Sequence, residues 1–204
     1  MFQDSEYKIA HANIDPRVRE SDFRVIMEPV AYALGSLDDM VFTLRKMGYF
    51  LAPGSTKYHD NYVGGLYHHS RRVTLILLSL TQKLNLRWKR PRSPYVVGMF
   101  HDLCKVDSYI DKGGNFEYNN YSTLDGHGEK SVMLAHHLGL QLNDEEVHCI
   151  RWHMGAYEGE SHWKAFDAAI KQYPNVLYTH LADMIDAKDI HDSLSLYQTD
   201  EFHL

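Results

Sequence analysis

The sequence predicts an all-α protein that folds as a single helical bundle. Apolar residues recur at helical spacing through most of the chain, without an internal repeat or a low-complexity tract. Most of these segments begin at a capping residue or a proline and end near a glycine, as helices do. The 204 residues, of which 44% are apolar, suit one domain with a substantial core.

The first half of the chain is predicted to form four helices, over residues 22–34, 36–47, 66–86 and 95–106. The second opens with a capping signature at Ser36 and stops at Gly48. Residues 49–65 contain Pro, Gly, Asn and Asp, so they are predicted to form a loop. Pro91 and Pro94 bracket the start of the fourth helix. One face of the third helix carries Val73, Leu77, Leu80 and Leu84.

The second half is predicted to continue as helices after a short interruption. The segment DKGGN, at 111–115, lies between YI and FEY and indicates a small hairpin or loop excursion near 107–126. A helix over 127–137 follows, and Asn143 with three acidic residues after it caps another that runs to about residue 154. Ser161 opens a further helix, and Pro174 starts the last long one.

The composition narrows the classes of protein that the chain can be. The formal net charge of −6 disfavours a protein that coats nucleic acid, although it is compatible with a local basic pocket. The two cysteines, Cys104 and Cys149, cannot form a disulfide framework and indicate a reducing compartment. The start lacks a signal-peptide pattern, and the longest apolar run, residues 75–80, is too short to span a bilayer. We therefore expect a soluble cytoplasmic protein without a membrane partner.

Fourteen histidines are the most unusual feature of the composition. A single histidine on an apolar helix is usually a packed core residue or a surface residue, so order and spacing carry more information than any one position. The regularly spaced set consists of His69, His101, Asp102, His127, His153 and Asp183. Their separations of 32, 25, 26 and 30 residues each match one helix with its connection, and an antiparallel bundle brings such positions to one level.

The residue types in this set indicate a divalent metal ion. Asp102 lies near the end of a predicted buried helix, where a carboxylate costs several kcal/mol unless something pairs with it, so it either lies at the surface or faces a cation. Four imidazoles and two carboxylates form a mixed nitrogen and oxygen donor set. Such a set suits Mn, Fe, Co, Ni or Mg better than a structural zinc ion.

The order of these residues resembles the H…HD…D signature of the HD-domain metal-dependent phosphohydrolases. The resemblance covers roughly residues 49–190 through the blocks APGSTKYH, GGLYHHS, HDLCK, GHGEKS, IRWHMG and HLADMIDAK. These blocks are similar to a bacterial and phage-borne group of HD hydrolases, and some are also similar to the HD-type 3′–5′ exoribonucleases. The resemblance implies an HD domain over 49–204, on which residues 1–48 pack as an N-terminal helical segment.

The resemblance also implies roles for the spaced residues. Members of the family hold a first ion at positions that correspond to His69, His101, Asp102 and Asp183. His127 and His153 match the additional histidines of two-metal members, in which Asp102 bridges the ions; contact with phosphate without a second ion is the alternative for this pair. The implied reaction is hydrolysis of a phosphoester of a nucleotide-type substrate by attack of metal-bound hydroxide, with Asp102 and Lys105 as catalytic residues.

Cations that flank the motif blocks are candidates for binding an anionic substrate. Lys105 lies three residues after Asp102, so we expect it on the same helix face and in contact with phosphate. The other candidate substrate-binding residues are His59, Lys57, Arg72 and Lys130. Each of these competes with an interpretation as ordinary surface charge. Lys105 also distinguishes the chain from the small 5′-nucleotidases of the superfamily, which carry Glu there and lack the two additional histidines.

Three functions stay open at this point. The first is a phosphohydrolase that acts on a phosphorylated small molecule, a nucleotide. The second is a 3′–5′ exonuclease or phosphodiesterase that acts on oligonucleotides, and the third is a non-catalytic HD domain that senses a nucleotide. All six ligand positions are filled, which favours catalysis, and residues 1–48 are not basic, which favours a small substrate over nucleic acid. The identity of the metal and the oligomeric state, a homodimer included, stay open.

Overall fold

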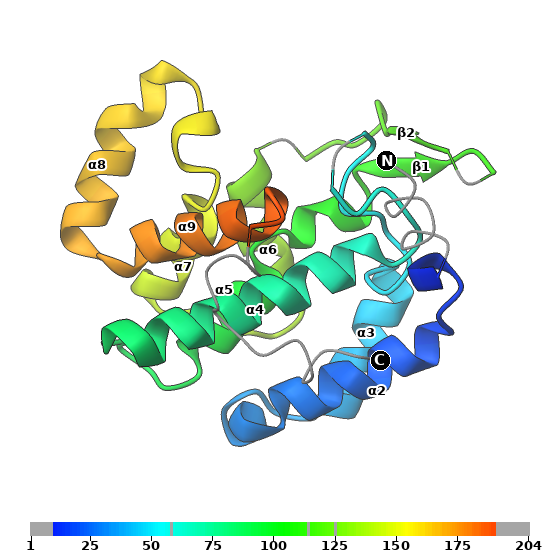
Figure 1. Ribbon diagram of the computed structural model, residues 1–204, viewed down its shortest axis with the longest axis horizontal. Helices are drawn as coiled ribbons and strands as arrows, with labels where there is room; N and C mark the ends of the chain where they lie inside the picture. The colour runs from blue at the N-terminus through cyan, green and yellow to red at the C-terminus, as the bar shows by residue number, and fades with distance from the viewer. Residues whose placement is uncertain (1–9, 58, 114, 125, 191–204) are drawn as a thin grey trace.

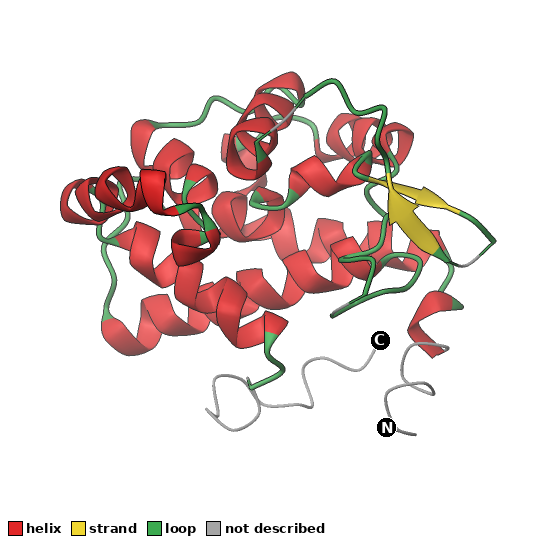
Figure 2. Ribbon diagram, turned by 90° about the horizontal axis from the view of Figure 1, so that it is seen from above, coloured by secondary structure: helices red, strands yellow, loops and turns green. Residues whose placement is uncertain are grey.

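The computed structural model describes residues 10–57, 59–113, 115–124 and 126–190. Within these residues the fold is helical apart from one short hairpin, as Figure 2 shows, so the predicted all-α class is confirmed. The α-helices are α2 (Pro16–Met27), α3 (Leu37–Met47), α4 (Gly65–Leu84), α5 (Ser93–Phe100), α6 (His127–His137), α7 (Asp144–Arg151), α8 (Trp163–Gln172) and α9 (Asn175–Ala187). Short 3₁₀ helices cover Glu28–Ala33, Leu103–Val106, Gly155–Tyr157 and Glu160–His162. The predicted segments 1–48 and 49–204 extend into 1–9 and 191–204, which lie outside the described residues.

Helix α4 is the central element of the molecule. It packs most extensively against α5 and α9, and Figure 1 shows α9 running along it. One core cluster joins side chains of α2 and α3 to the first half of α4 and to α5, and it includes Phe23, Leu44, Tyr67 and Phe100. A second cluster joins the later part of α4 and Val97 of α5 to α7, α8 and α9, and it includes Leu77, Ile150 and Val176. Both clusters therefore share α4 and α5.

The hairpin predicted near 107–126 is present. Its strands, β1 (Tyr109–Asp111) and β2 (Phe116–Tyr118), pair antiparallel, with Tyr109 opposite Tyr118. Two of the predicted helix starts are also confirmed. The hydroxyl of Ser36 accepts a hydrogen bond from the amide of Asp39 at 3.2 Å, and Asn143 forms a capping box with Glu146. These local side-chain bonds satisfy amide groups that a helix start leaves unpaired.

Two details of the early helices were predicted wrongly. The first helix begins at Pro16 rather than at residue 22, because the Asp15 carboxylate accepts from the amide of Arg17 at 2.8 Å and starts the helix earlier. It ends at Met27, and the rest of the predicted span is a 3₁₀ helix. In α4, Leu84 was assigned to the apolar face, yet as the last residue of the helix it is 52% exposed, next to the exposed residues 82 and 83.

Two further helices end earlier than predicted, and both breaks occur at the spaced histidines. The helix predicted over 95–106 stops at Phe100, and His101 and Asp102 form a turn before a 3₁₀ segment. The helix predicted to reach residue 154 stops at Arg151, so His153 lies just beyond it. His101 and Asp102 therefore do not lie on one continuous helix, as the prediction of a helix over 95–106 required, since Asp102 has non-helical torsions of φ −104° and ψ 18°.

A buried arginine connects α2 to the loop that follows α3. Arg19 is fully buried, and its guanidinium donates to the carbonyl oxygens of His11, Phe50 and Val63 at 2.9, 3.1 and 3.0 Å. Its Nε also donates to Nε2 of His68 at 3.3 Å. The backbone comes this close because Gly64 has no side chain, since a Cβ there would lie 2.3 Å from Cζ of Arg19.

A comparison of two glycines tests the importance of this anchor. Gly64 and Gly35 both have positive φ, at 86° and 83°, but a Cβ at Gly35 would have no atom within 4 Å. We expect Gly35→Ala to lower the free energy of unfolding by about 1 kcal/mol from backbone strain alone. Gly64→Ala should lower it by about 2 kcal/mol more, because it also displaces buried hydrogen bonds of Arg19. Urea unfolding of both variants measures the difference, and equal losses would show that the anchor contributes nothing.

Candidate metal centre

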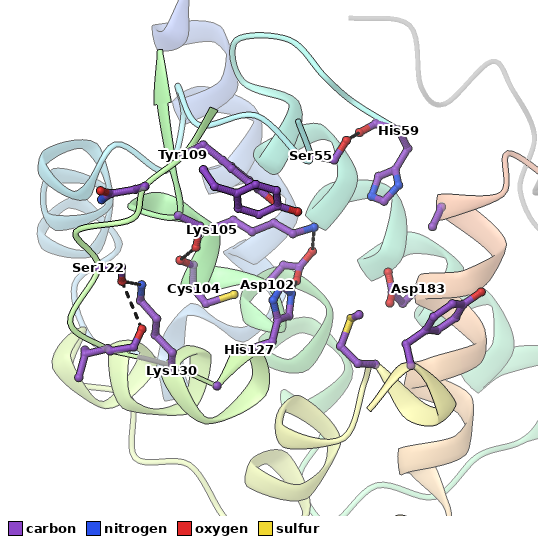
Figure 3. Close-up of a pocket in the computed structure, with 18 of the residues that line it drawn as sticks. Ser55, His59, Asp102, Cys104, Lys105, Tyr109, Ser122, His127, Lys130 and Asp183 are labelled. Atoms are coloured by element: carbon purple, nitrogen blue, oxygen red, sulfur yellow. Dashed lines mark hydrogen bonds and ion pairs between the residues drawn. The ribbon is translucent and has the colours of Figure 1, made fainter. Parts of the chain in front are cut away.

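Five separate parts of the chain bring the spaced histidines and aspartates together. His69 lies in the second turn of α4, His127 is the first residue of α6, and Asp183 is on α9. His101 and Asp102 occupy the turn after α5, and His153 follows α7. Figure 3 shows Asp102, His127 and Asp183 around one cavity. The structure therefore places all six residues at one level of the bundle.

The approach of α6 to the end of α7 depends on a glycine. A Cβ at Gly128 would lie 2.2 Å from the carbonyl oxygen of Arg151, so the two helix ends can meet only where that side chain is absent. The rings of His127 and His153 are consequently 5.3 Å apart between centroids.

The carboxylate of Asp102 is at the middle of the cluster. Asp102 is 2% exposed, and its two oxygens face different pairs of histidines. Oδ2 lies 3.3 Å from Nε2 of His69 and 3.6 Å from Nε2 of His101. Oδ1 lies 2.7 Å from Nε2 of His127 and 3.3 Å from Nε2 of His153. The two carboxylate oxygens thus have two sets of neighbours, and these sets adjoin, since ligand atoms of His101 and His153 lie within 4.8 Å of one another.

Asp183 completes the first of these sets. Its Oδ1 lies 3.1 Å from Nε2 of His69 and 3.8 Å from Nε2 of His101. The two imidazole Nε2 atoms are themselves only 3.2 Å apart, although both rings are fully buried. Imidazole nitrogens and carboxylate oxygens in such proximity require a cation or a shared proton between them.

The outer nitrogens of the rings orient the inner ones. Nδ1 of His101 donates to the carbonyl oxygen of Gly98 at 2.8 Å, and Nδ1 of His153 donates to that of Ile150 at 2.7 Å. These bonds leave the lone pair of each Nε2 directed into the cluster, as metal ligation requires. Within the described part of the chain, Nε2 of His153 is buried without a hydrogen-bond partner. The donor set therefore fits a divalent metal ion.

The imidazoles of the centre differ in protonation. Burial would lower the pKa of His69, but its carboxylate neighbours raise it. Burial would also lower the pKa of His127, but Cys104 and Asp102 raise it to about 10. A divalent ion would have to displace the protons of these two rings.

Burial lowers the pKa of His101 to about 3, so its imidazole is neutral and carries a lone pair at physiological pH. Burial alone would raise the pKa of Asp102, but the ammonium of Lys105 and the neighbouring imidazoles hold it well below the usual range. Lys105 in turn would lose its proton more easily on burial, yet Asp102, at 2.5 Å, raises the pKa of Lys105 above its ordinary value. The two groups stay charged together.

Asp186 is a residue of the centre that the sequence analysis did not assign. Its buried carboxylate accepts from Nδ1 of His69 at 2.7 Å and from Nε of Arg72 at 2.6 Å. A continuous chain of polar contacts leads from it to the N-terminal helix through Arg72, Asp60, Tyr62, His68 and Arg19. Asp183 and Asp186 are three residues apart on one helix, so both lie on one face. This spacing could have identified Asp186 from the sequence.

A cavity of about 710 Å³ opens above the cluster, and it contains some of the predicted substrate-binding residues but not others. Lys105, His59 and Lys130 line it, and the ring of His59 is 4.8 Å from that of His69. Lys130 pairs with Asp107 and donates to Ser122 at 2.9 Å. Lys57 is exposed, and Arg72 pairs with Asp60 and Asp186; among the described residues, neither lines the cavity.

The fold is a helical bundle, and its centre brings together four imidazoles and two carboxylates. These features indicate a helical protein that binds divalent metal ions. The model of the HD domain family matches residues 66–188, which is more than half of the chain. The chain therefore belongs to the HD-domain metal-dependent phosphohydrolase superfamily. Comparison with curated proteins gives no match, and comparison with solved structures gives none either. None of the helices within residues 10–190 has both the length and the apolar character needed to cross a membrane.

Asp186 gives a test of how the centre is oriented. We expect Asp186→Asn to weaken binding of Mn²⁺ or Zn²⁺ by about 10- to 100-fold, because the amide cannot hold His69 and pair with Arg72 as the carboxylate does. Calorimetric titration measures the affinity, and a melting curve checks folding. Asp167→Asn is the control, since Asp167 pairs with Lys171 on the surface. Equal metal affinities in the two variants would contradict the positioning role.

Proposed function

We propose that the chain is a metal-dependent phosphohydrolase that cleaves a phosphoester of a nucleotide-type substrate at a dinuclear centre. The observation that carries the proposal is the position of Asp102 beside a cavity, where each of its two oxygens faces two histidines. His69, His101 and Asp183 would hold one ion with it, and His127 and His153 the other. Two divalent ions in such a site polarise a phosphoryl oxygen and lower the pKa of a water molecule that they share.

The residues of the chain would supply the rest of the chemistry. Lys105 keeps its positive charge beside Asp102, where it can bind a phosphoryl oxygen and offset the negative charge that develops during hydrolysis. His127 has a side chain that is 33% exposed, so it faces the cavity, whereas His101 is fully buried below it. A substrate phosphate would therefore approach from the side of His127 and Lys105.

The upper part of the cavity supports a substrate with an aromatic group. Tyr109, Tyr118 and Tyr157 all line it, and Tyr118 is 64% exposed at its rim. The rings of Tyr109 and Tyr118 lie 5.4 Å apart on the hairpin. Aromatic side chains of this kind stack on nucleobases. A volume of about 710 Å³ is also suitable for a small organic ligand with its phosphate.

The first test of the proposal is a count of metal ions together with an activity screen. Protein purified without chelator should contain close to two divalent ions per chain. With added Mn²⁺ it should release phosphate or nucleotide from a panel of nucleotides, cyclic dinucleotides and short RNA and DNA. Tight nucleotide binding without turnover under any ion would instead support the sensor function.

Variants separate the two halves of the centre. Asp102→Ala should remove both ions and all activity while the helical circular dichroism is kept, because Asp102 contacts both sets of histidines. His153→Ala should lower the metal content by about one ion per chain. The control is His137→Ala, since His137 is exposed on the same helix as His127. Full activity of the Asp102 variant would rule out the dinuclear centre.

Tyr118 tests the nucleotide part of the proposal. We expect Tyr118→Ala to raise KM for a nucleotide substrate about tenfold with little change in kcat, because a base that stacks on tyrosine gains about 1–3 kcal/mol. Tyr121→Ala is the matched control, since Tyr121 is 86% exposed and does not line the described cavity. An unchanged KM in the Tyr118 variant would show that the base does not bind at the hairpin.

A further inference from the structure

Cys104 lies inside the centre, two residues after Asp102. It is 1% exposed, and Figure 3 shows its sulfur atom directed toward Asp102 and His127. Its Sγ, a carboxylate oxygen of Asp102 and an imidazole nitrogen of His127 all lie within 4.8 Å of one another. One small ion can therefore contact all three atoms after sub-ångström to ångström movements, since Zn–S and Zn–N bonds are about 2.3 and 2.0 Å long.

The backbone keeps Cys104 in register with His127. The amide of Cys104 donates to the hydroxyl of Ser131 at 3.1 Å, and that hydroxyl donates to the carbonyl oxygen of His127 at 3.1 Å. Ser131 thus connects the 3₁₀ segment of Cys104 to the first turn of α6. This connection fixes the position of the thiol beside the imidazole.

A second observation points to a ligand at the same place. His153 is fully buried, and its Nε2 has no hydrogen-bond partner within the described residues, although it lies 3.3 Å from Oδ1 of Asp102. This is the oxygen that also faces His127. Asp102 is thus shared by the orphan nitrogen of His153 and by the group of Cys104 and His127.

We infer that Cys104 supplies a thiolate ligand to the ion held by Asp102, His127 and His153, so that the two halves of the centre differ in chemistry. The inference rests on the proposed function, because it concerns the second ion of that centre. Ligation releases the thiol proton to solvent and forms one metal–sulfur bond. A donor set of two nitrogens, one oxygen and one sulfur favours Zn²⁺, Co²⁺, Fe²⁺ or Ni²⁺ over Mg²⁺ or Mn²⁺. The set of His69, His101, Asp102 and Asp183 contains no sulfur.

The alternative is that Cys104 only forms part of the cavity wall, and Cys149 shows what a packing cysteine looks like here. Cys149 is also fully buried, but it belongs to the second core cluster with residues of α7 and α9. It is therefore the natural control for every measurement on Cys104.

Cobalt titration of the metal-free full chain tests the inference. Co²⁺ should produce a thiolate-to-cobalt charge-transfer band in the near ultraviolet for the native chain and for Cys149→Ser. Cys104→Ser should lack this band while it still takes up cobalt at the sulfur-free set. Cobalt uptake by the native chain without the band would overturn thiolate ligation and leave the proposed function standing. Failure to bind cobalt at all would overturn both.

Thiol protection gives an independent readout that does not need the Cys104 variant to fold. In the Cys149→Ser chain, alkylation of Cys104 by iodoacetamide should be at least about tenfold slower with Zn²⁺ than without metal, because a bound thiolate is a poor nucleophile. Mg²⁺ should give no such protection. Equal protection by the two ions would mean that metal binding only closes access to the thiol, and no protection by Zn²⁺ would contradict ligation.

Discussion

The burial of the Asp102 carboxylate is the interaction on which the rest of the structure depends. A charged group that is 2% exposed requires compensation from every side. Lys105 supplies one positive charge, and the imidazoles and a divalent ion would supply the remainder. This requirement explains why residues from distant parts of the chain meet at one place. It also explains why His101 and His153 stand at helix ends, where the backbone turns and side chains can point inward.

Most of the fold could be predicted from local patterns, because a few residues determine where a helix begins. Ser36 and Asn143 are examples, since their side chains accept the first amide hydrogen bonds. The break after Phe100 could not be predicted. The apolar spacing continues through Val106, and no Gly or Pro marks the end of α5. The turn at His101 and Asp102 arises because both side chains must face the same point, which is a demand of the tertiary structure.

The candidate site was predictable where residue type and spacing coincided, and less so elsewhere. The six spaced residues converge. This could be predicted because imidazoles and carboxylates seldom recur at helix-length intervals by chance. Arg72 shows the limit of such reasoning. A cation near a motif suggested contact with substrate, but its guanidinium pairs with Asp60 and Asp186 behind His69. Cys104 and the tyrosines of the hairpin gave no signal, because small apolar and aromatic residues occur throughout every core.

The separate origins of the six side chains have a consequence for the connectivity of the chain. An ion at the centre would tie together segments of different helices, as a disulfide ties two, and each tie would close a loop about the length of a helix and its connection. It would also join the core cluster that contains α2 and α3 to the one that contains α8 and α9. Removal of the ion would leave these clusters connected by α4, α5 and α6 and by the polar chain from Asp186 to Arg19. The metal-free chain would therefore have fewer cross-links between its two clusters, and each cluster could open more easily without the other.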